Sequence, residues 1–493
     1  MKPEPAWADQ FVIAGGLLLT DPAQPAQAGD LWIEAGLIRA LGAPGAFAGQ
    51  AGLQVIDASD RLVIPGLVNG HTHAHGALGR GAVDDVALEG FLAASPAING
   101  QRGLADLELS ATLTAVELLR RGCTASFDVS GEFPQTTVPG LLTVAGAYHR
   151  VGLRAVVAPM LADRSLWQAY PELVQGLPAE WQGTLAALPA LSAQGQLDAV
   201  RQAAADWPFD TSRVRLGLAP TIPLHCSEAL LRACAALSEA FGLPMQTHLA
   251  ESHAQATLGR QRYDRSLVAH LADLGLLSPR FSVAHAIWVS DADIDLLAAA
   301  GVTAIHNPLS NLRLGSGLAP VRRMLERGLQ VGLGTDGANT SDTQNLFEGM
   351  RLAAGLSRVL DADQARWVTG AEALQMATAG SARALGMDAR IGRIAPGFAA
   401  DLVLLDLSQP HYVPLRDTTR QLVHGENGSA VDRVLVAGRL VVDQGRVLTV
   451  DEAELRQRAQ AAAERLDALN QAGRHLSQVL RPWVSAFCCG FGR

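Results

Sequence analysis

The chain has 493 residues, of which 48% are hydrophobic and 18% charged, and its net charge is −9. This composition predicts a large buried core, and the chain is longer than one small domain requires. Neither a basic stripe nor an apolar run long enough for a bilayer is present, so the expected partner is a small molecule rather than nucleic acid or a membrane.

The cysteines favour a reducing compartment, because none belongs to a CxxC pair and their spacing forms no disulfide framework. They are Cys123, Cys226, Cys234, Cys488 and Cys489. The first residues, MKPEPAWADQFVIAGG, lack the apolar run of a signal peptide. We therefore expect a cytoplasmic protein.

Residues 1–61 predict short β-strands broken by turns. Within them Leu31 and Ile33 alternate with Trp32 and Glu34, which is the pattern of a half-buried strand. The same pattern of short strands and turns recurs in residues 393–450, in segments such as DLVLLDL and RVLVAGRLVV. Two β-rich flanks around a long middle predict that both chain ends build one small β-sandwich.

Residues 62–392 alternate short apolar runs with helical patterns. The runs expected to be strands are LVIPGLVNGH, TASFDVS, LRAVVAPM, VRLGLAPT, PMQTH, FSVAH, VTAIHN and QVGLGTD. Between them, Leu109, Leu113 and Val116 recur at helical spacing before Gly122, a typical residue at a helix end. Repeated strand–helix units predict parallel strands joined by right-handed crossovers, and eight such units predict an α/β fold of the (β/α)8 TIM-barrel type.

Residues 451–493 predict a C-terminal helix followed by a tail. The apolar positions recur on one helical face, at Leu455, Ala459, Ala462, Leu466 and Leu469. The last six residues, CCGFGR, predict a disordered end with no chemical role.

Side chains that bind metals close four of the predicted strands. His71 and His73 share one face of the first strand, since side chains two residues apart point the same way. His248 ends PMQTH, His285 ends FSVAH and Asp336 ends VGLGTD. A lone histidine at a strand end more often serves a structural hydrogen bond. Because the C-terminal ends of barrel strands meet above one core, the five together predict a joint metal site.

The order of these motifs resembles the amidohydrolase superfamily, in its branch of deaminases and triazine-type aminohydrolases and chlorohydrolases. The matching segments are PGLVNGHTH, HLAE, VAHAIWV, IHNPLSNLRLGSGLAPV, LGTDGANTSDTQNLFEGMR and GRIAPGFAADLVLLD. They extend over residues 62–406, which is most of the chain.

The resemblance implies that four residues bind the metal: His71, His73, His248 and Asp336. Relatives with two metals commonly bridge them with a carboxylated lysine on the fourth strand, whereas VRLGLAPT has no lysine, so one ion is expected. The histidine-rich set favours zinc, and Fe²⁺ would accept the same ligands. A divalent ion with an open position lowers the pKa of water from about 15.7 to about 7, which supplies hydroxide at neutral pH.

The same resemblance implies that Glu251, in HLAE, moves the proton, a transfer worth ~10²–10⁴-fold in rate. Asp336 would share the water proton, and His285 would orient the water or the substrate. The other interpretation of Glu251 is a surface glutamate at a helix start. His306 and Asn307 lie in a segment that contacts substrate in related deaminases.

Departures from the family's pattern concern the substrate. The loop after the first strand keeps Arg80, an expected substrate contact, but lacks the tryptophan-rich segment of adenosine-type and triazine-type relatives. Thr221 stands where many adenosine-type deaminases have a histidine; His225 would compensate, or would cap the following helix. Both departures argue against S-adenosylhomocysteine or methylthioadenosine as substrate. With 5% aromatic residues, the sequence identifies no stacking platform for a base.

The leading hypothesis is hydrolytic deamination of an amino-substituted N-heterocycle, such as a pterin, purine, pyrimidine or triazine. Its nearest competitors use the same site to open a cyclic amide or to displace chloride. A different class is a non-catalytic barrel that only binds a ligand, but the complete ligand set and Glu251 favour an enzyme. A homodimer or larger homo-oligomer is expected because family members often form one.

Overall fold

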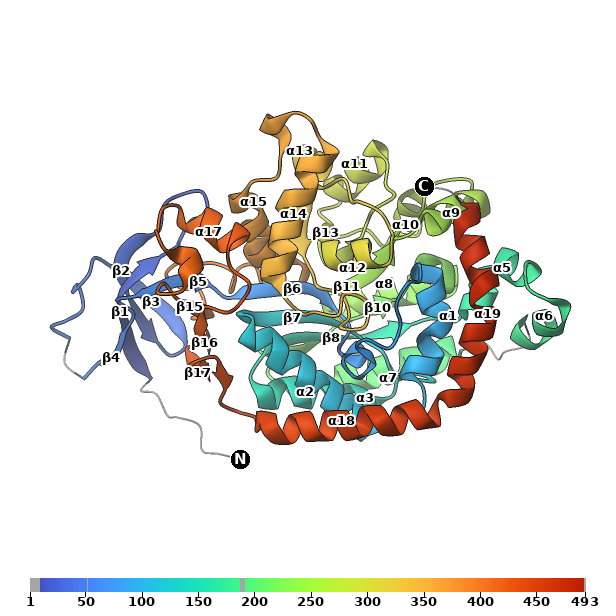
Figure 1. The fold of residues 1–493 in the computed structure, drawn as a ribbon, viewed down its shortest axis with the longest axis horizontal. Helices are drawn as coiled ribbons and strands as arrows, with labels where there is room; N and C mark the ends of the chain where they lie inside the picture. Colours follow the sequence, from blue (N-terminus) through green and yellow to red (C-terminus); the bar gives the residue numbers. More distant parts are fainter. Residues whose placement is uncertain (1–8, 51, 187–190, 492–493) are drawn as a thin grey trace.

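The structure is a computed structural model that describes residues 9–50, 52–186 and 191–491. The runs predicted as strands in residues 62–392 all contain strands, and all of these except the strand that opens the first run lie in two parallel sheets (Figure 1). One sheet contains β6 (Leu67–Thr72), β7 (Cys123–Ser130), β8 (Arg154–Leu161), β9 (Val214–Leu216) and β10 (Ala219–Pro220). The other contains β11 (Met245–Leu249), β12 (Phe281–His285), β13 (Thr303–His306) and β14 (Gln330–Leu333).

Hydrogen bonds join the two parallel sheets at both of their junctions. Leu218, between β9 and β10, forms a parallel bridge with Met245. On the other side, the N–H groups of Thr335 and Asp336 donate to the carbonyl oxygen of His71 at 3.1 and 3.0 Å. The carboxyl ends of the strands in both sheets therefore face one common region.

The run predicted as the first strand divides into two strands at Gly66. β5 (Arg61–Pro65) pairs antiparallel with β15 (Leu402–Asp406), whereas β6 pairs parallel with β7. A Cβ at position 66 would lie 2.1 Å from Thr124 Oγ1, so the close approach requires glycine. Hydrophobicity does not reveal this break, because residues 62–72 are buried throughout.

Both chain flanks contribute to one nine-stranded sheet at one end of the molecule. Its other strands are β1 (Gln10–Leu18), β2 (Gln27–Glu34), β3 (Leu37–Gly42), β4 (Gln54–Asp57), β16 (Val431–Val436), β17 (Arg439–Asp443) and β18 (Arg446–Val447). Buried apolar side chains from both flanks, such as Ile13 and Leu435, form a second core there. The two β-rich flanks of the chain are thus held together in one sheet at this end of the molecule.

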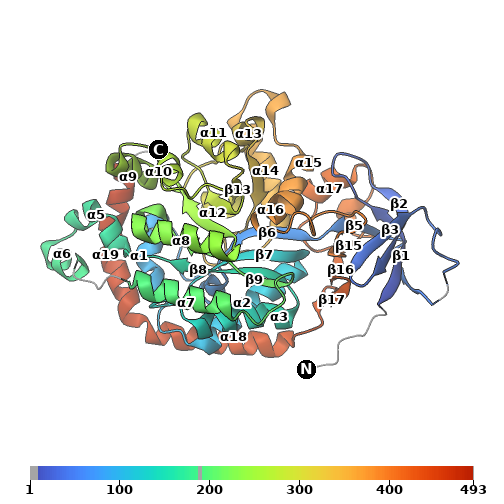
Figure 2. The same ribbon diagram turned by 180° about the vertical axis from the view of Figure 1, so that it is seen from behind.

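Helices pack outside the parallel strands, as both views show (Figures 1 and 2). Those before β11 are α1 (Leu88–Asn99), α2 (Leu104–Arg120), α3 (Val138–Val151), α4 (Leu166–Ala169), α5 (Pro171–Gln175), α6 (Ala179–Ala186), α7 (Ala193–Ala205) and α8 (Glu228–Phe241). Those between β11 and β16 are α9 (His253–Tyr263), α10 (Leu267–Asp273), α11 (Asp291–Ala299), α12 (Pro308–Arg313), α13 (Val321–Glu326), α14 (Leu346–Leu360), α15 (Gly370–Gln375), α16 (Ser381–Ala384) and α17 (Thr418–His424). The predicted helix before Gly122 is confirmed as α2.

The described end of the chain is helical, so the prediction of a disordered CCGFGR tail is wrong for its cysteines. The predicted helix is α18 (Glu452–Leu469), and α19 (Gln471–Gly490) follows it through Cys488 and Cys489. α18 runs along one side of the molecule and α19 rises beside α1 (Figures 1 and 2). Leu480 and Val484 of α19 are buried, and this packing supplies the order that the tail's composition did not predict. Residues 492–493 lie outside the described part.

None of the described helices is long and apolar enough to cross a lipid bilayer. The cysteines are all unpaired, as their spacing predicted.

Candidate active site

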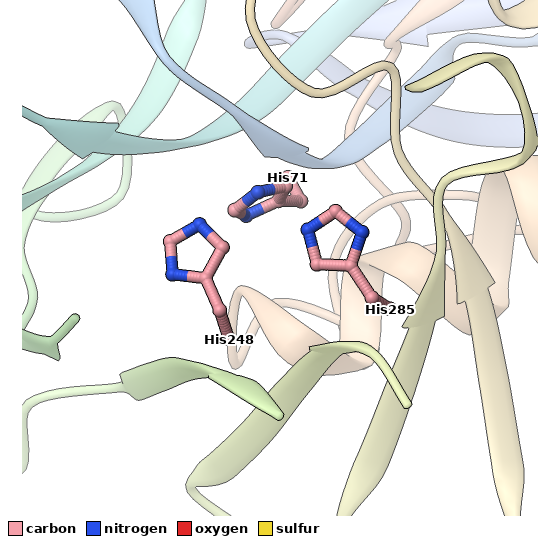
Figure 3. Close-up of side chains that lie close together, drawn as sticks. All are labelled: His71, His248 and His285. Carbon is pink, nitrogen blue, oxygen red and sulfur yellow. The ribbon is translucent and has the colours of Figure 1, made fainter. Parts of the chain in front are cut away.

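The strand ends bring imidazoles and a carboxylate to one point. His71 lies in β6, His248 in β11 and His285 at the end of β12, and Figure 3 shows their rings facing one another. His73 directly follows β6, and its Nε2 lies 3.0 Å from Nε2 of His248. Asp336 follows β14, and its Oδ1 lies 3.5 Å from His71 Nε2 and 3.3 Å from His73 Nε2.

The two histidines of the HxH motif are each held through Nδ1. His71 Nδ1 lies 2.6 Å from Oε1 of Gln246, whose amide nitrogen donates to other buried acceptors. His73 Nδ1 donates to the carbonyl oxygen of Val129 at 2.7 Å. A carbonyl oxygen only accepts, so Nδ1 carries the proton and Nε2 presents its lone pair to the site.

The other two histidines follow the same rule. His248 Nδ1 donates to the carbonyl oxygen of Thr221 at 2.6 Å, and His285 Nδ1 lies 2.9 Å from Oδ1 of Asn311. All four imidazoles therefore turn an unprotonated Nε2 toward the same point. Acceptors that orient metal-binding histidines in this way are a regular feature of metal sites.

This arrangement fits a divalent cation. The Nε2 atoms of His73 and His248, 3.0 Å apart, would repel through their lone pairs unless a cation lies between them. Nitrogen ligands of a tetrahedral zinc ion lie about 3.3 Å apart, given Zn–N bonds of ~2.0–2.1 Å. Nε2 of His71 and of His285 is buried without a hydrogen-bond partner among the described residues. Neutral nitrogen donors with one carboxylate are a set that zinc accepts.

Burial keeps three of these imidazoles neutral. It lowers the pKa of His73 and of His285 from 6.5 to about 4, and it lowers the pKa of His248 well below the usual value. Burial works against ionisation of Asp336, yet its contacts with His71 and His73 hold its pKa well below the usual range. Metal ligands must be unprotonated, so the site suits a cation at neutral pH.

Glu251 lies just beyond β11 and is 2% exposed, which excludes the surface glutamate of the alternative interpretation. Its N–H donates to Oε1 of Gln255 at 3.0 Å, and its Oε1 lies 3.6 Å from His285 Nδ1. Burial first, and then the charges of Asp336 and Glu89, raise the pKa of Glu251 well above its usual value. A raised pKa suits a carboxyl group to general acid–base work, in which it first accepts a proton and then delivers it.

Backbone strain occurs at two of these positions. His285 has a φ of 69° and Asp336 a φ of 61°, in the left-handed region that costs a non-glycine residue ~1–3 kcal/mol. Close packing also requires glycine at position 334, because a Cβ there would lie 2.4 Å from Asn307 Oδ1 and 2.8 Å from His71 Cβ. Such strained residues cluster at functional sites, and here both strained side chains turn toward the same point.

A cavity of about 510 Å³ opens beside this cluster and is lined by His73, His248, Glu251 and Asp336. Its walls carry three aromatic side chains, Phe91 of α1, Phe133 and Trp167 of α4. The sequence did not reveal this aromatic wall, because the rings come from three separate segments of a chain poor in aromatic residues. Polar groups at the same walls were also missed, namely Glu132, Arg164 and Gln196. No motif marks them, since Glu132 follows β7, Arg164 follows β8 and Gln196 lies in α7.

The structure brings together six of the predicted site residues, which are His71, His73, His248, Glu251, His285 and Asp336. His225 also lines the cavity, close to Thr221. Arg80 does not line it, because its side chain pairs with Glu117 beside a different cavity.

His306 and Asn307 also lie outside the lining of the 510 Å³ cavity. His306 lines a separate cavity of about 250 Å³ that also borders α13 and α14. Asn307 is fully buried, with its side chain against Gly334 and His71. Adjacent residues at a strand end point to opposite faces, which is why the two separate.

These strands and this site define a metal-dependent hydrolase. A sequence profile of the amidohydrolase family matches residues 62–441, more than half of the chain, and the chain belongs to that family.

Relatives that are named as deaminases match most of the chain. A 5-methylthioadenosine/S-adenosylhomocysteine deaminase of Desulforudis audaxviator is 35% identical over 89% of this chain and 95% of its own. A 5'-deoxyadenosine deaminase of Methanothermobacter thermautotrophicus is 33% identical over 84% of this chain and 89% of its own. The chain is a hydrolytic deaminase that acts on C–N bonds other than peptide bonds.

Two solved structures are similar in fold. An adenosine deaminase from Xanthomonas campestris with bound zinc has a TM-score of 0.81 and 26% identity, over 94% of this chain and 100% of its own. An atrazine chlorohydrolase from Arthrobacter aurescens complexed with zinc has the same TM-score and identity, over 92% of this chain and 100% of its own. Together with the histidine and aspartate cluster, these zinc-bound neighbours support a divalent metal.

Proposed function

We propose that this deaminase removes the exocyclic amine of an adenine nucleoside altered at its 5' position, with one zinc ion at the site. The observation that carries the proposal is the convergence of four Nε2 lone pairs, Asp336 and a buried Glu251 beside an aromatic cavity. The substrates in the names of the relatives favour adenine nucleosides over pterins, pyrimidines and triazines.

In the sequence analysis, the threonine at position 221 counted against such substrates, because many adenosine-type deaminases have a histidine there. The carbonyl oxygen of Thr221 accepts a hydrogen bond from His248, and Thr221 lines the cavity together with His225. A histidine therefore remains available at this wall, which supports a nucleoside substrate despite the departure from the family's pattern.

The residues that would hold the metal are His71, His73, His248 and Asp336, with Fe²⁺ as the alternative to zinc. A divalent ion bound by them lowers the pKa of a water molecule so that hydroxide is available at neutral pH.

Glu251 takes the proton of the attacking water and delivers it to the ring nitrogen next to the carbon under attack. A C–O bond forms at that carbon, the remaining proton of the attacking oxygen passes to the amine, and the C–N bond breaks to release ammonia and leave a carbonyl. His285, held by Asn311, orients the water. Phe91, Phe133 and Trp167 would hold the heterocycle and exclude bulk water.

We infer that the parallel strands close as a (β/α)8 barrel, supported by the hydrogen bonds at both sheet junctions, and that the flank sheet folds into a small β-sandwich. The unpaired cysteines favour the cytoplasm. We also expect a homodimer or a larger homo-oligomer.

Ammonia release tests the function directly. We expect release from 5'-deoxyadenosine, 5-methylthioadenosine or S-adenosylhomocysteine, and its loss after chelation with recovery on adding zinc. A panel with adenosine, guanine, a pterin and an aminotriazine serves as the comparison. Faster release from any non-adenine compound would reject the nucleoside assignment.

The similarity to the atrazine chlorohydrolase favours a second candidate, displacement of chloride from a chlorotriazine by the same site. Chloride release without ammonia from such a compound, at a rate above that for the nucleosides, would make it the better assignment.

A further inference from the structure

A second buried carboxylate, Glu89 of α1, lies close to Glu251. It is 2% exposed, and the structure gives it no ion pair within the described residues. Its Oε1 accepts a hydrogen bond from Ser252 Oγ at 2.5 Å, and its Oε2 accepts one from Cys488 Sγ at 3.3 Å. Burying a carboxylate away from any cation is costly, so these two bonds and the first turn of α1 must compensate for it.

Ser252 connects Glu89 to the backbone of the neighbouring Glu251. Its Oγ donates to Glu89 and accepts from the N–H of Gln255 at 3.1 Å. The side chain of Gln255 in turn accepts the N–H of Glu251 at 3.0 Å. Glu89, Ser252, Gln255 and Glu251 thus form one hydrogen-bonded chain, in which the position of Glu89 bears on the position of Glu251.

The C-terminal helix α19 supports the other side of Glu89. Cys488 comes from its last turn, and burial, followed by Glu89, raises the pKa of that thiol, so it remains a hydrogen-bond donor. Further along, a Cβ on Gly473 would lie 3.3 Å from Ala97 Cβ, so α19 packs closely on α1. Since α1 also carries Phe91, this helix both forms a wall of the proposed substrate cavity and packs against α19.

The end of α19 also contacts the Glu251 segment and the opposite wall. The carbonyl oxygen of Phe491 accepts a hydrogen bond from Nδ1 of His253, two residues after Glu251. The ring of Phe487 lies 6.0 Å from that of Tyr170, which lies 5.5 Å from the ring of the cavity residue His225. Both figures of the whole chain show α19 running beside α1 (Figures 1 and 2).

We propose that Glu89 is a positioning residue for Glu251, and that the C-terminal helix holds Glu89 in place through Cys488. This inference rests on the proposed role of Glu251 in proton transfer. It gives the cysteine-containing end of the chain a part in catalysis although it touches no substrate.

The test uses the full-length, metal-loaded enzyme. Glu89→Gln keeps the volume but removes the charge and one acceptor, and we expect kcat to fall about tenfold while KM changes less than about twofold and metal content stays constant. Ser252→Ala should behave similarly, and Ser252→Thr, which restores the hydroxyl, should recover kcat. Cys488→Ala should cause a smaller loss that Cys488→Ser reverses. Trp483→Ala, at an exposed position of the same helix, is the matched control and should leave kcat unchanged.

A double variant separates positioning from general stability. Because Glu89 acts through Glu251, Glu89→Gln should reduce kcat no further in an enzyme that already carries Glu251→Gln. Fully additive losses would overturn the inference, as would a Glu89→Gln enzyme with wild-type kcat and only a lowered melting temperature. If the wild-type enzyme releases no ammonia from any compound of the panel, the proposed function fails first and this inference fails with it.

Discussion

Gln344 joins two of the strand ends that carry the proposed metal ligands, those of β6 and β14. It is fully buried, and its Oε1 accepts from the hydroxyls of Thr72 and Thr335 at 2.7 and 2.9 Å. Its Nε2 donates to the carbonyl oxygen of Asp336 at 2.8 Å. Since Thr72 lies between the two histidines of HTH, one side chain sets the spacing between β6 and β14 at the site.

Gln344→Leu should therefore weaken metal binding by about 10–100-fold, the range found for residues that orient metal ligands. The fraction of zinc retained against a series of chelator concentrations measures this. Gln460→Leu, on the exposed face of α18, is the control, and equal retention by both variants would refute the role of Gln344.

Glu251→Gln should lower kcat by about 10²–10⁴-fold, because the amide cannot carry the proton. Its zinc content should stay near that of the wild type, since Glu251 is not among the proposed ligands. Asp336→Ala should instead lower the zinc content, and its loss of activity should follow from the loss of metal. Elemental analysis beside steady-state kinetics distinguishes the two, and a fully active Glu251→Gln enzyme would remove this residue from the mechanism.

At the level of elements, one buried ion pair ties the parallel strands to the flank sheet. Arg154 of β8 donates from Nε and Nη2 to Asp401, just before β15, at 2.7 and 3.0 Å. Asp401 also accepts the N–H of Ala437 at 2.7 Å. Both side chains are almost completely buried, so neither charge has water as a substitute partner.

Asp401→Ala should lower the free energy of unfolding by about 3–5 kcal/mol, the cost of leaving a buried charge unpaired. Asp443→Ala, which breaks the more exposed pair with Arg433, should cost less than about 1 kcal/mol. Chemical denaturation of both variants measures the difference. Similar small losses would mean that Arg154 finds another partner.

For the whole molecule, buried histidines dominate the expected response to acid. Seven have a pKa held below 6.5, chiefly by burial: His73, His75, His225, His248, His270, His285 and His306. Below pH 6.5 the unfolded chain binds protons that these folded groups do not bind, and folded His73, His225 and His285 bind theirs only near pH 4. Asp128, with its pKa raised to about 7 by burial, and Glu251 act in the opposite sense, but they are fewer.

The metal-free protein should therefore lose stability as the pH falls from about 6.5 to about 4, because its unfolded state binds more protons there. The denaturant midpoint at pH 7, 6 and 5 is the measurement. A midpoint that stays constant or rises would show that the raised carboxyl groups outweigh the histidines.

Much of this protein was predictable from local pattern alone. The apolar runs identified every parallel strand, and their terminal polar residues identified the cluster of His71, His73, His248, His285 and Asp336. Both succeed for the same reason: a strand's burial and its last residue are local properties, and parallel strands must bring their carboxyl ends together.

Only the tertiary structure decided what surrounds that cluster. The break at Gly66, the aromatic wall of the cavity, and the contact of Cys488 with Glu89 join segments that are distant in sequence. Arg80, His306 and Asn307 were expected to contact the substrate because of the resemblance to the family, but they do not line the cavity beside the cluster. Side-chain direction in loops and the docking of a terminal helix depend on packing between distant elements, which no local pattern of residues encodes.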